Sequence, residues 1–203
     1  NALQPGFRFL AGLATRAAQY AYAFSDTNNV TPTQVKSALV SGQLFASVAV
    51  QGVKARVSDW STGTLSVSGG TKAGTMTRAA VKLPTGSNHD LRLLQSPTAT
   101  GAQAVNLGWA PDGLIIVASM HDTLETFDPA ADGEGFAVCI ASQSACHSVA
   151  ISSKPGLAAS NTHSHLDTQL RVYFGGNVVG LEAAVSLTPT GYSFDWTKVR
   201  PEG

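Results

Sequence analysis

Apolar residues in the first part of the chain recur at helical spacing. Between residues 4 and 24 they stand three or four positions apart, at Leu10, Leu13, Ala14, Ala17, Ala21 and Phe24, which is the spacing of one face of an α-helix. Pro5 fits the first turn of such a helix. Five consecutive turn-prone residues at 25–29 would end it. We therefore expect an N-terminal helix and a break in residues 1–28.

A second, shorter helix is predicted in residues 29–43 by residues typical of helix starts and ends. Thr31 is a suitable N-cap, Pro32 suits the first helical position, and Gln34 stands three residues after the cap. Gly42 follows as a stop signal.

From residue 44 onward the pattern becomes that of β-strands. Apolar segments bounded by Gly, Pro, Asn or Asp predict strands at 44–51, 53–57, 64–68, 79–83, 104–109, 114–119, 136–141, 147–152, 169–174 and 177–187. Helices followed by sequential strands are typical of an α+β fold. We expect a single globular domain of residues 1–203, with the N-terminal helix and the second short helix packed on a mainly antiparallel β-sheet in residues 44–203.

Composition narrows the classes of partner. Only 13% of residues are charged, about half the roughly 25% of an average domain, while Ala, Ser, Thr and Gly make up 29, 20, 19 and 20 residues. A formal net charge of zero argues against binding nucleic acid or an anionic membrane through bulk positive charge. Hydrophobic residues at 43% argue against global disorder.

Charge is distributed unequally between the two halves of the chain. Residues 1–100 carry nine basic and three acidic side chains, a balance of +6, and residues 101–203 carry four and ten, a balance of −6. One interpretation is that the halves neutralise each other within the fold. The other is a subunit with opposite poles that docks head to tail with further copies and so propagates into a filament.

The two cysteines, Cys139 and Cys146, have six residues between them. The intervening residues are typical of a turn between two short apolar strands, so we predict a disulfide; two buried free thiols are the alternative. The resulting eight-residue ring would stabilise the fold by roughly 2–3 kcal/mol. A disulfide would indicate an oxidising compartment.

Histidines are the candidate metal ligands. If residues 162–167 formed a strand, His163, His165 and Asp167 would share one face, as a divalent metal site with nitrogen and oxygen ligands requires. His121 and His147 could complete that site. The alternative is a solvated loop, because the preceding residues 158–162 have loop composition. We expect no bound metal and no other cofactor.

No catalytic signature is present in the sequence. A Gly-x-Ser-x-Gly elbow, a Ser-x-x-Lys pair and the phosphate-binding glycine loops are all absent. The two Gly-Gly segments, at 69–70 and 175–176, are typical of hairpin turns. We expect a protein that is not an enzyme.

The order of elements resembles the soluble domain of a type IV pilin or minor pilin. The resemblance consists of an Ala- and aromatic-rich first helix, a polar break, a helix beginning at Thr31, and a Ser/Thr/Gly-rich sheet with a cysteine pair in its second half. It implies that residues 4–24 continue a longer helix whose hydrophobic half lies upstream of Asn1, and that the chain contacts a membrane only through that segment. The short cysteine spacing departs from the longer loop that many pilins close.

The resemblance implies a structural subunit of an extracellular filament. Its partners would be other copies or related subunits, and its exposed loops would serve adhesion or surface recognition. It would lie outside the cell or at the cell surface, and in the periplasm before assembly. The alternatives are a secreted β-rich ligand-binding module and a periplasmic metalloenzyme that uses His121, His147, His163 and His165.

Overall fold

The described part of this chain contains antiparallel strands and no helix. The structure is a computed structural model that describes residues 8–14, 18–27, 34–41, 45–46, 54–59, 66–68, 86–120, 127–129, 134–153, 163–174 and 178–200. Its strands are β1 (Arg8–Ala14), β2 (Gln19–Thr27), β3 (Gln34–Ser41), β4 (Phe45–Ala46), β5 (Lys54–Asp59), β6 (Ser66–Ser68), β7 (Gly101–Asn106), β8 (Gly113–Ser119), β9 (Phe127–Pro129), β10 (Glu134–Ser142), β11 (Cys146–Ser153), β12 (His163–Asp167), β13 (Leu170–Phe174), β14 (Val178–Thr188) and β15 (Gly191–Lys198).

The predicted α+β fold class is therefore wrong, and so are both predicted helices. The segment 4–24 contains β1 and most of β2, which pair with Gly12 opposite Ala21, and the segment 29–43 contains β3. The helical spacing of 4–24 depended largely on alanines, which are numerous enough to occur at any spacing. Tyr20, Tyr22 and Phe24 alternate with smaller residues, and aromatic residues at a period of two favour a strand. The predicted cap at Thr31 lies outside the described residues.

The strands after residue 44 were predicted more accurately. The predictions at 114–119, 136–141, 147–152, 169–174 and 177–187 are confirmed in position by β8, β10, β11, β13 and β14. Strands β9 and β15 were missed, and β12 was predicted only as one of two alternatives, a strand or a loop. The strand predicted at 79–83 lies outside the described residues.

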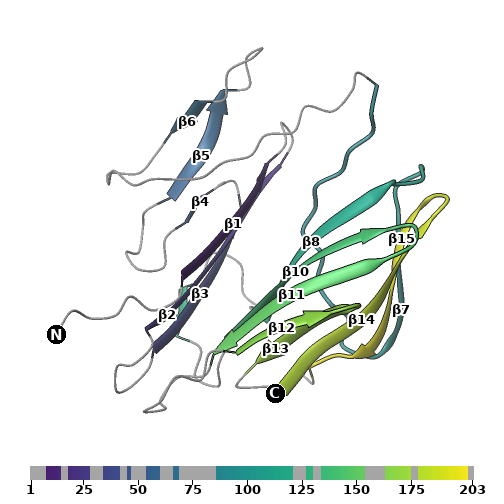
Figure 1. The fold of residues 1–203 in the computed structure, drawn as a ribbon. Helices are drawn as coiled ribbons and strands as arrows, with labels where there is room; N and C mark the ends of the chain where they lie inside the picture. The colour runs from purple at the N-terminus through teal and green to yellow at the C-terminus, as the bar shows by residue number, and fades with distance from the viewer. Residues whose placement is uncertain are drawn as a thin grey trace.

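Two four-stranded antiparallel sheets face each other (Figure 1). The front sheet has the order β12-β11-β10-β8, and the back sheet has the order β13-β14-β15-β7. Strands β1, β2, β3 and β9 form a third sheet, and β4, β5 and β6 form a smaller one. Figure 1 shows β1, β2 and β3 on the opposite side of the front sheet from the back sheet.

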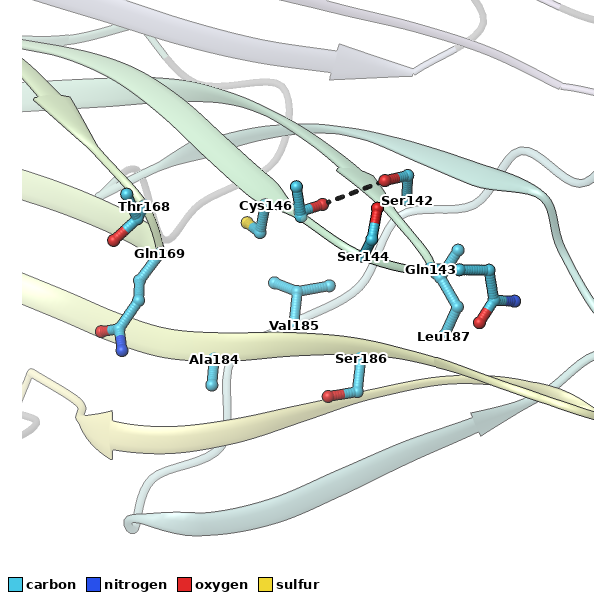
Figure 2. A pocket seen from close by; sticks show the side chains of 11 residues that line it. Ser142, Gln143, Ser144, Cys146, Thr168, Gln169, Ala184, Val185, Ser186 and Leu187 are labelled. Carbon is cyan, nitrogen blue, oxygen red and sulfur yellow. Dashed lines mark hydrogen bonds between the residues drawn. The ribbon is translucent and has the colours of Figure 1, made fainter.

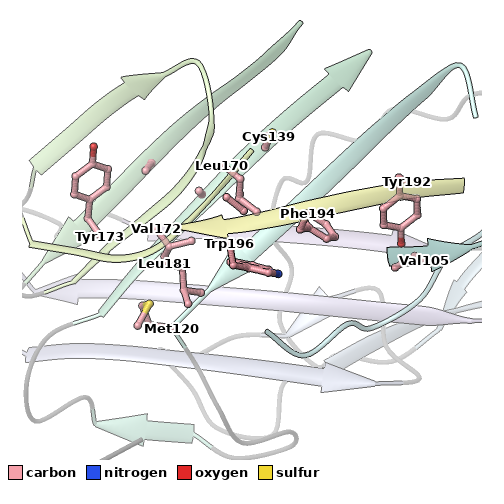
Figure 3. Packing of buried hydrophobic residues seen from close by; sticks show 13 residues of the cluster. Val105, Met120, Cys139, Leu170, Val172, Tyr173, Leu181, Tyr192, Phe194 and Trp196 are labelled. Atoms are coloured by element: carbon pink, nitrogen blue, oxygen red, sulfur yellow. The ribbon is translucent and has the colours of Figure 1, made fainter. Parts of the chain in front are cut away.

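The front and back sheets share one hydrophobic core. On the back sheet, Tyr192, Phe194 and Trp196 alternate along β15 and point into this core (Figure 3). The core also takes residues from both sheets that include Val105, Met120, Ala137, Cys139, Ala150, Leu170, Val172, Leu181 and Ala183. Because successive side chains of a strand point to opposite faces, the other face of the front sheet points away from the core. We call this second surface the outer face.

The two sheets are in close backbone contact at Gly135 of β10. A Cβ atom at this position would overlap the backbone carbonyl of Tyr173 in β13. Only glycine has no Cβ, so only glycine allows the two backbones to come this close. This contact fixes how β13, on the back sheet, lies over β10.

Candidate functional sites

The outer face of the front sheet is apolar over most of its surface. The pairing register places Val117, Val138 and Val149 side by side on it, with Ile115 opposite Ile140 in the next row. At one end of the face, Phe136 is buried under Tyr22 of β2, with ring centroids 5.7 Å apart. Val117, Val138 and Ile151 pack against this Tyr22–Phe136 pair. The third sheet thus covers one end of the outer face.

The other end of the outer face leaves large apolar side chains exposed. Exposed fractions are 60% for Ile115, 61% for Ile140, 51% for Val149 and 78% for Leu166. These four residues lie on all four strands of the front sheet and are named the outer patch. Sequence reasoning missed the patch, although the apolar runs 114–118 and 136–141 do not alternate with polar residues. Such runs are typical of strands that are covered on both faces.

The two cysteines lie on neighbouring strands and are close enough to react. Cys139 is opposite Ser148 and Cys146 is opposite Ala141 in the β10–β11 pairing, so the two cysteines are diagonal neighbours. Their Sγ atoms are 2.9 Å apart, and both thiols are free in the structure. A disulfide needs about 2.05 Å. Burial, together with the neighbouring Cys146, raises the pKa of the Cys139 thiol well above its usual range. The predicted disulfide remains a prediction.

A polar pocket opens beside Cys146 between the turn after β10 and strand β14 (Figure 2). Its volume is about 430 Å³. Hydroxyl and amide side chains provide most of the lining, with no charged residue, and the residues are Ser142, Gln143, Ser144, Ala145, Cys146, Thr168, Gln169, Ala184, Val185, Ser186 and Leu187. Within the turn, the Ser142 hydroxyl is 3.4 Å from the Ala145 carbonyl to which it donates. No sequence motif predicts this pocket, because its lining comes from three separate segments.

The histidine pair lies on strand β12, on the face that points toward the back sheet. His165 is opposite Ala150, His163 is opposite Ser152, and Asp167 is opposite Ser148, so the expected shared face of a strand is present. The imidazole of His165 stacks on the ring of Tyr173, with centroids 3.7 Å apart and 11° between the planes. Burial lowers the pKa of His165.

Asp167 is engaged by the protein itself. Arg171 donates from a terminal guanidinium nitrogen to Asp167 Oδ1 at 2.8 Å, and the Tyr173 hydroxyl donates to Oδ2 at 3.0 Å. Arg171 also donates from Nε to Glu182 of β14 at 2.6 Å. A hydrogen bond from Thr197, together with Arg171, lowers the pKa of Glu182. The contacts to Asp167 join the front sheet to the back sheet, whereas the contacts to Glu182 lie within the back sheet.

The predicted metal ligands do not come together within the described part of the chain. No group of three or more His, Cys, Asp or Glu side chains positioned for a metal ion occurs there. His147 is opposite Ile140, which places it on the outer face, away from His163 and His165. His121 lies outside the described residues. Among the residues described, the arrangement around Asp167 is an ionic and aromatic link between sheets.

Comparisons with protein-family models, with curated proteins and with solved structures find no match to this chain. The class is therefore defined by the structure: over the residues described, it is an antiparallel all-β fold with two facing sheets and an exposed apolar patch. Over the residues described, no helix is long and apolar enough to cross a membrane.

Proposed function

We propose that this protein is a structural subunit of an extracellular assembly, and that copies of it associate through the outer patch. The observation that carries the proposal is the exposure of Ile115, Ile140, Val149 and Leu166 side by side on one sheet. Contiguous exposed apolar side chains are typical of surfaces that bind another protein. Burying each of them between copies would remove apolar area from water.

A second copy of the chain is the proposed occupant of the outer patch, for two reasons. First, the patch continues the surface where Phe136 already packs against a β-strand of the same chain, so the face accepts a sheet. Second, the paired positions at the outer patch carry apolar, Ser and His147 side chains, and the one acidic position in the described register of the outer face, Glu134, is opposite Ser153 at the far end, beyond Phe136. Two copies that associate through the outer patch about a two-fold axis would therefore bring no like-charged Asp, Glu, Lys or Arg side chains together at the patch.

A filament needs a second contact in addition to a two-fold one. The oppositely charged halves of the sequence are the proposed source of that contact. The ion pairs described by the structure, Arg92 with Asp90 and Arg171 with Asp167 and Glu182, each join residues of the same half. Because each of these pairs lies within one half of the sequence, none of them neutralises the charge of one half with that of the other.

The extracellular location is supported by composition and by the cysteines. Low charge, abundant hydroxyl side chains and two Sγ atoms at 2.9 Å suit an oxidising compartment. The proposal does not use the pilin layout, because the segment expected to form its first helix consists of strands β1 and β2.

The experiment is sedimentation velocity across a range of protein concentrations. The wild-type chain is compared with the double variant Ile140→Ser/Leu166→Ser, and Leu93→Ser is the control because Leu93 is also exposed, at 45%, but lies outside the sheets. We expect concentration-dependent association of the wild type and of the control. The double variant should associate at least tenfold more weakly, since a loss of about 1.4 kcal/mol is tenfold in affinity. A wild-type protein that stays monomeric, or equal association of all three, would refute the proposal.

A further inference from the structure

The cysteine pair is asymmetric in its access to solvent. Cys139 is 0% exposed and belongs to the shared core of the two sheets. Cys146 is half-buried and lines the polar pocket, whereas Cys139 does not (Figure 2). The two are the only cysteines of the sequence, so a disulfide within one chain can form only between them. An external reagent can therefore reach the pair only from the side of Cys146.

The pocket beside Cys146 has a definite chemical character. Gln143, Thr168 and Gln169 line the pocket and offer amide and hydroxyl groups (Figure 2). Uncharged donors and acceptors of this kind match the amide groups of a peptide. Val185 and Leu187 supply an apolar floor. The pocket suits a molecule that carries peptide-like polar groups next to a sulfur atom.

We infer that Cys146 is the entry sulfur for thiol–disulfide exchange, and that the pocket receives a peptide-type disulfide that oxidises the pair. The inference rests on the 2.9 Å separation of the two Sγ atoms, the burial of Cys139 and the position of Cys146 in the pocket. It is independent of the proposed assembly, since the pocket lies between the sheets and the outer patch lies on the opposite face of the front sheet.

The chemistry takes two exchange steps. In the first, the thiolate of Cys146 attacks one sulfur of the disulfide R–S–S–R, which forms a mixed disulfide with Cys146 and releases one R–S⁻, and the proton lost from Cys146 ends on that leaving thiolate. In the second, Cys139 loses its proton and its sulfur attacks Sγ of Cys146, which releases the second R–S⁻ to take up that proton. The two protein thiols are oxidised to one disulfide, and R–S–S–R is reduced to two thiols.

The burial of Cys139 separates the roles of the two sulfurs. The thiolate is the reactive form of cysteine, and a buried thiol with a raised pKa reacts slowly with a reagent in solution. The second step is nevertheless accessible to Cys139, because the sulfur that it attacks is its direct neighbour. The structure thus assigns attack on the external disulfide to Cys146 and resolution of the mixed disulfide to Cys139.

The experiment uses oxidised glutathione as the disulfide probe and mass spectrometry of the intact protein and its peptides. In Cys139→Ser, we expect a stable mixed disulfide at Cys146. In Cys146→Ser, we expect Cys139 to be modified at least ~100-fold more slowly, because its thiol is buried. The wild type should pass to an internal disulfide. Near-ultraviolet circular dichroism checks that both variants fold.

A second measurement does not depend on cysteine variants. Brief exposure of the reduced wild type to iodoacetamide should alkylate Cys146 well before Cys139. Equal rates at the two cysteines, or faster modification of Cys139 in either experiment, would overturn the inference. So would the absence of any mixed disulfide in folded Cys139→Ser.

The role of the pocket is tested separately with Val185→Trp, because Val185 points from β14 toward Cys146 (Figure 2). The matched control is Ser186→Trp on the same strand, because Ser186 is opposite Ser193 and points away from the front sheet. We expect Val185→Trp to slow the reaction of Cys146 with oxidised glutathione at least fivefold relative to its reaction with the small reagent methyl methanethiosulfonate, with near-ultraviolet circular dichroism again checking the fold. Ser186→Trp should leave both rates unchanged. An equal effect of Val185→Trp on both reagents would show that the pocket does not receive the disulfide.

Discussion

The imidazole of His165 lies flat on the ring of Tyr173, with ring centroids 3.7 Å apart and the planes inclined by 11°. His165 belongs to the front sheet and Tyr173 to the back sheet. The short turn between β12 and β13 carries the chain from one sheet to the other, and the Tyr173 hydroxyl bonds back to Asp167 at the end of β12. This stack and this hydrogen bond hold the crossing strands together.

Tyr173 should contribute to stability in two separable ways. Tyr173→Phe keeps the ring that stacks on His165 and removes the hydroxyl that donates to Asp167, so it should lower the free energy of unfolding by about 1 kcal/mol. Tyr173→Ala removes both and should cost about 3–5 kcal/mol. Urea unfolding followed by circular dichroism measures both values. Similar losses in the two variants would show that the ring contributes nothing beyond the hydroxyl.

His165 should make the protein less stable in mild acid. Burial lowers the pKa of His165 in the folded protein, with Asp167 opposing and His163 reinforcing the shift. The unfolded chain then binds the proton more readily than the folded chain, so stability falls as the pH falls through the unfolded value of about 6.5. His165→Phe keeps an aromatic ring on Tyr173 but does not titrate.

The measurement is the free energy of unfolding from about pH 7.5 down to about pH 5, the range in which histidine titrates. The wild type should lose more stability over this range than His165→Phe does. The control is His89→Phe, because His89 is exposed and lies outside the sheets, and its profile should follow the wild type. Parallel profiles for wild type and His165→Phe would contradict the assignment.

Gly135 should not tolerate a side chain. In Gly135→Ala the new Cβ would overlap the Tyr173 carbonyl, so β10 and β13 would have to move apart, at a cost of roughly 2–4 kcal/mol. Gly113→Ala is the matched control on the same sheet, since its Cβ would meet the Ala141 carbonyl oxygen at 3.4 Å, an ordinary contact. Thermal unfolding should show a large decrease in melting temperature for the first variant only. A decrease of the same size in both would show that the Tyr173 carbonyl does not restrict position 135.

Much of the front and back sheets could be predicted from local sequence, because their strands are bounded by turn residues and rich in β-branched residues. Strand β15 was missed, although Tyr192, Phe194 and Trp196 alternate with polar residues in the expected period. Strand β12 was predicted only conditionally, yet its consequence, a shared face for His163, His165 and Asp167, is correct. The prediction of helices at 4–24 and 29–43 was wrong because alanine spacing and local capping signals favour a helix only weakly. Sheet pairing with distant residues outweighs that preference.

Contacts between sheets could not be predicted from sequence. The stack of His165 on Tyr173 and the ion pair of Arg171 with Asp167 require the order of strands and the packing of one sheet on the other. The proximity of Cys139 and Cys146 was accessible, because both belong to one hairpin. The outer patch could also have been predicted from the sequence, since the residues of β8 and β10 are apolar on both faces.

The most direct test of the proposed assembly is photo-cross-linking from the outer patch. Benzoylphenylalanine in place of Leu166, which is 78% exposed on β12, should yield a covalent dimer on illumination, with cross-linked peptides that contain β8, β10, β11 or β12 of the second copy. The same group in place of Leu93 should yield little dimer. Cross-links from position 166 to the back sheet of another copy, or no dimer at concentrations where the protein sediments as an assembly, would contradict the account.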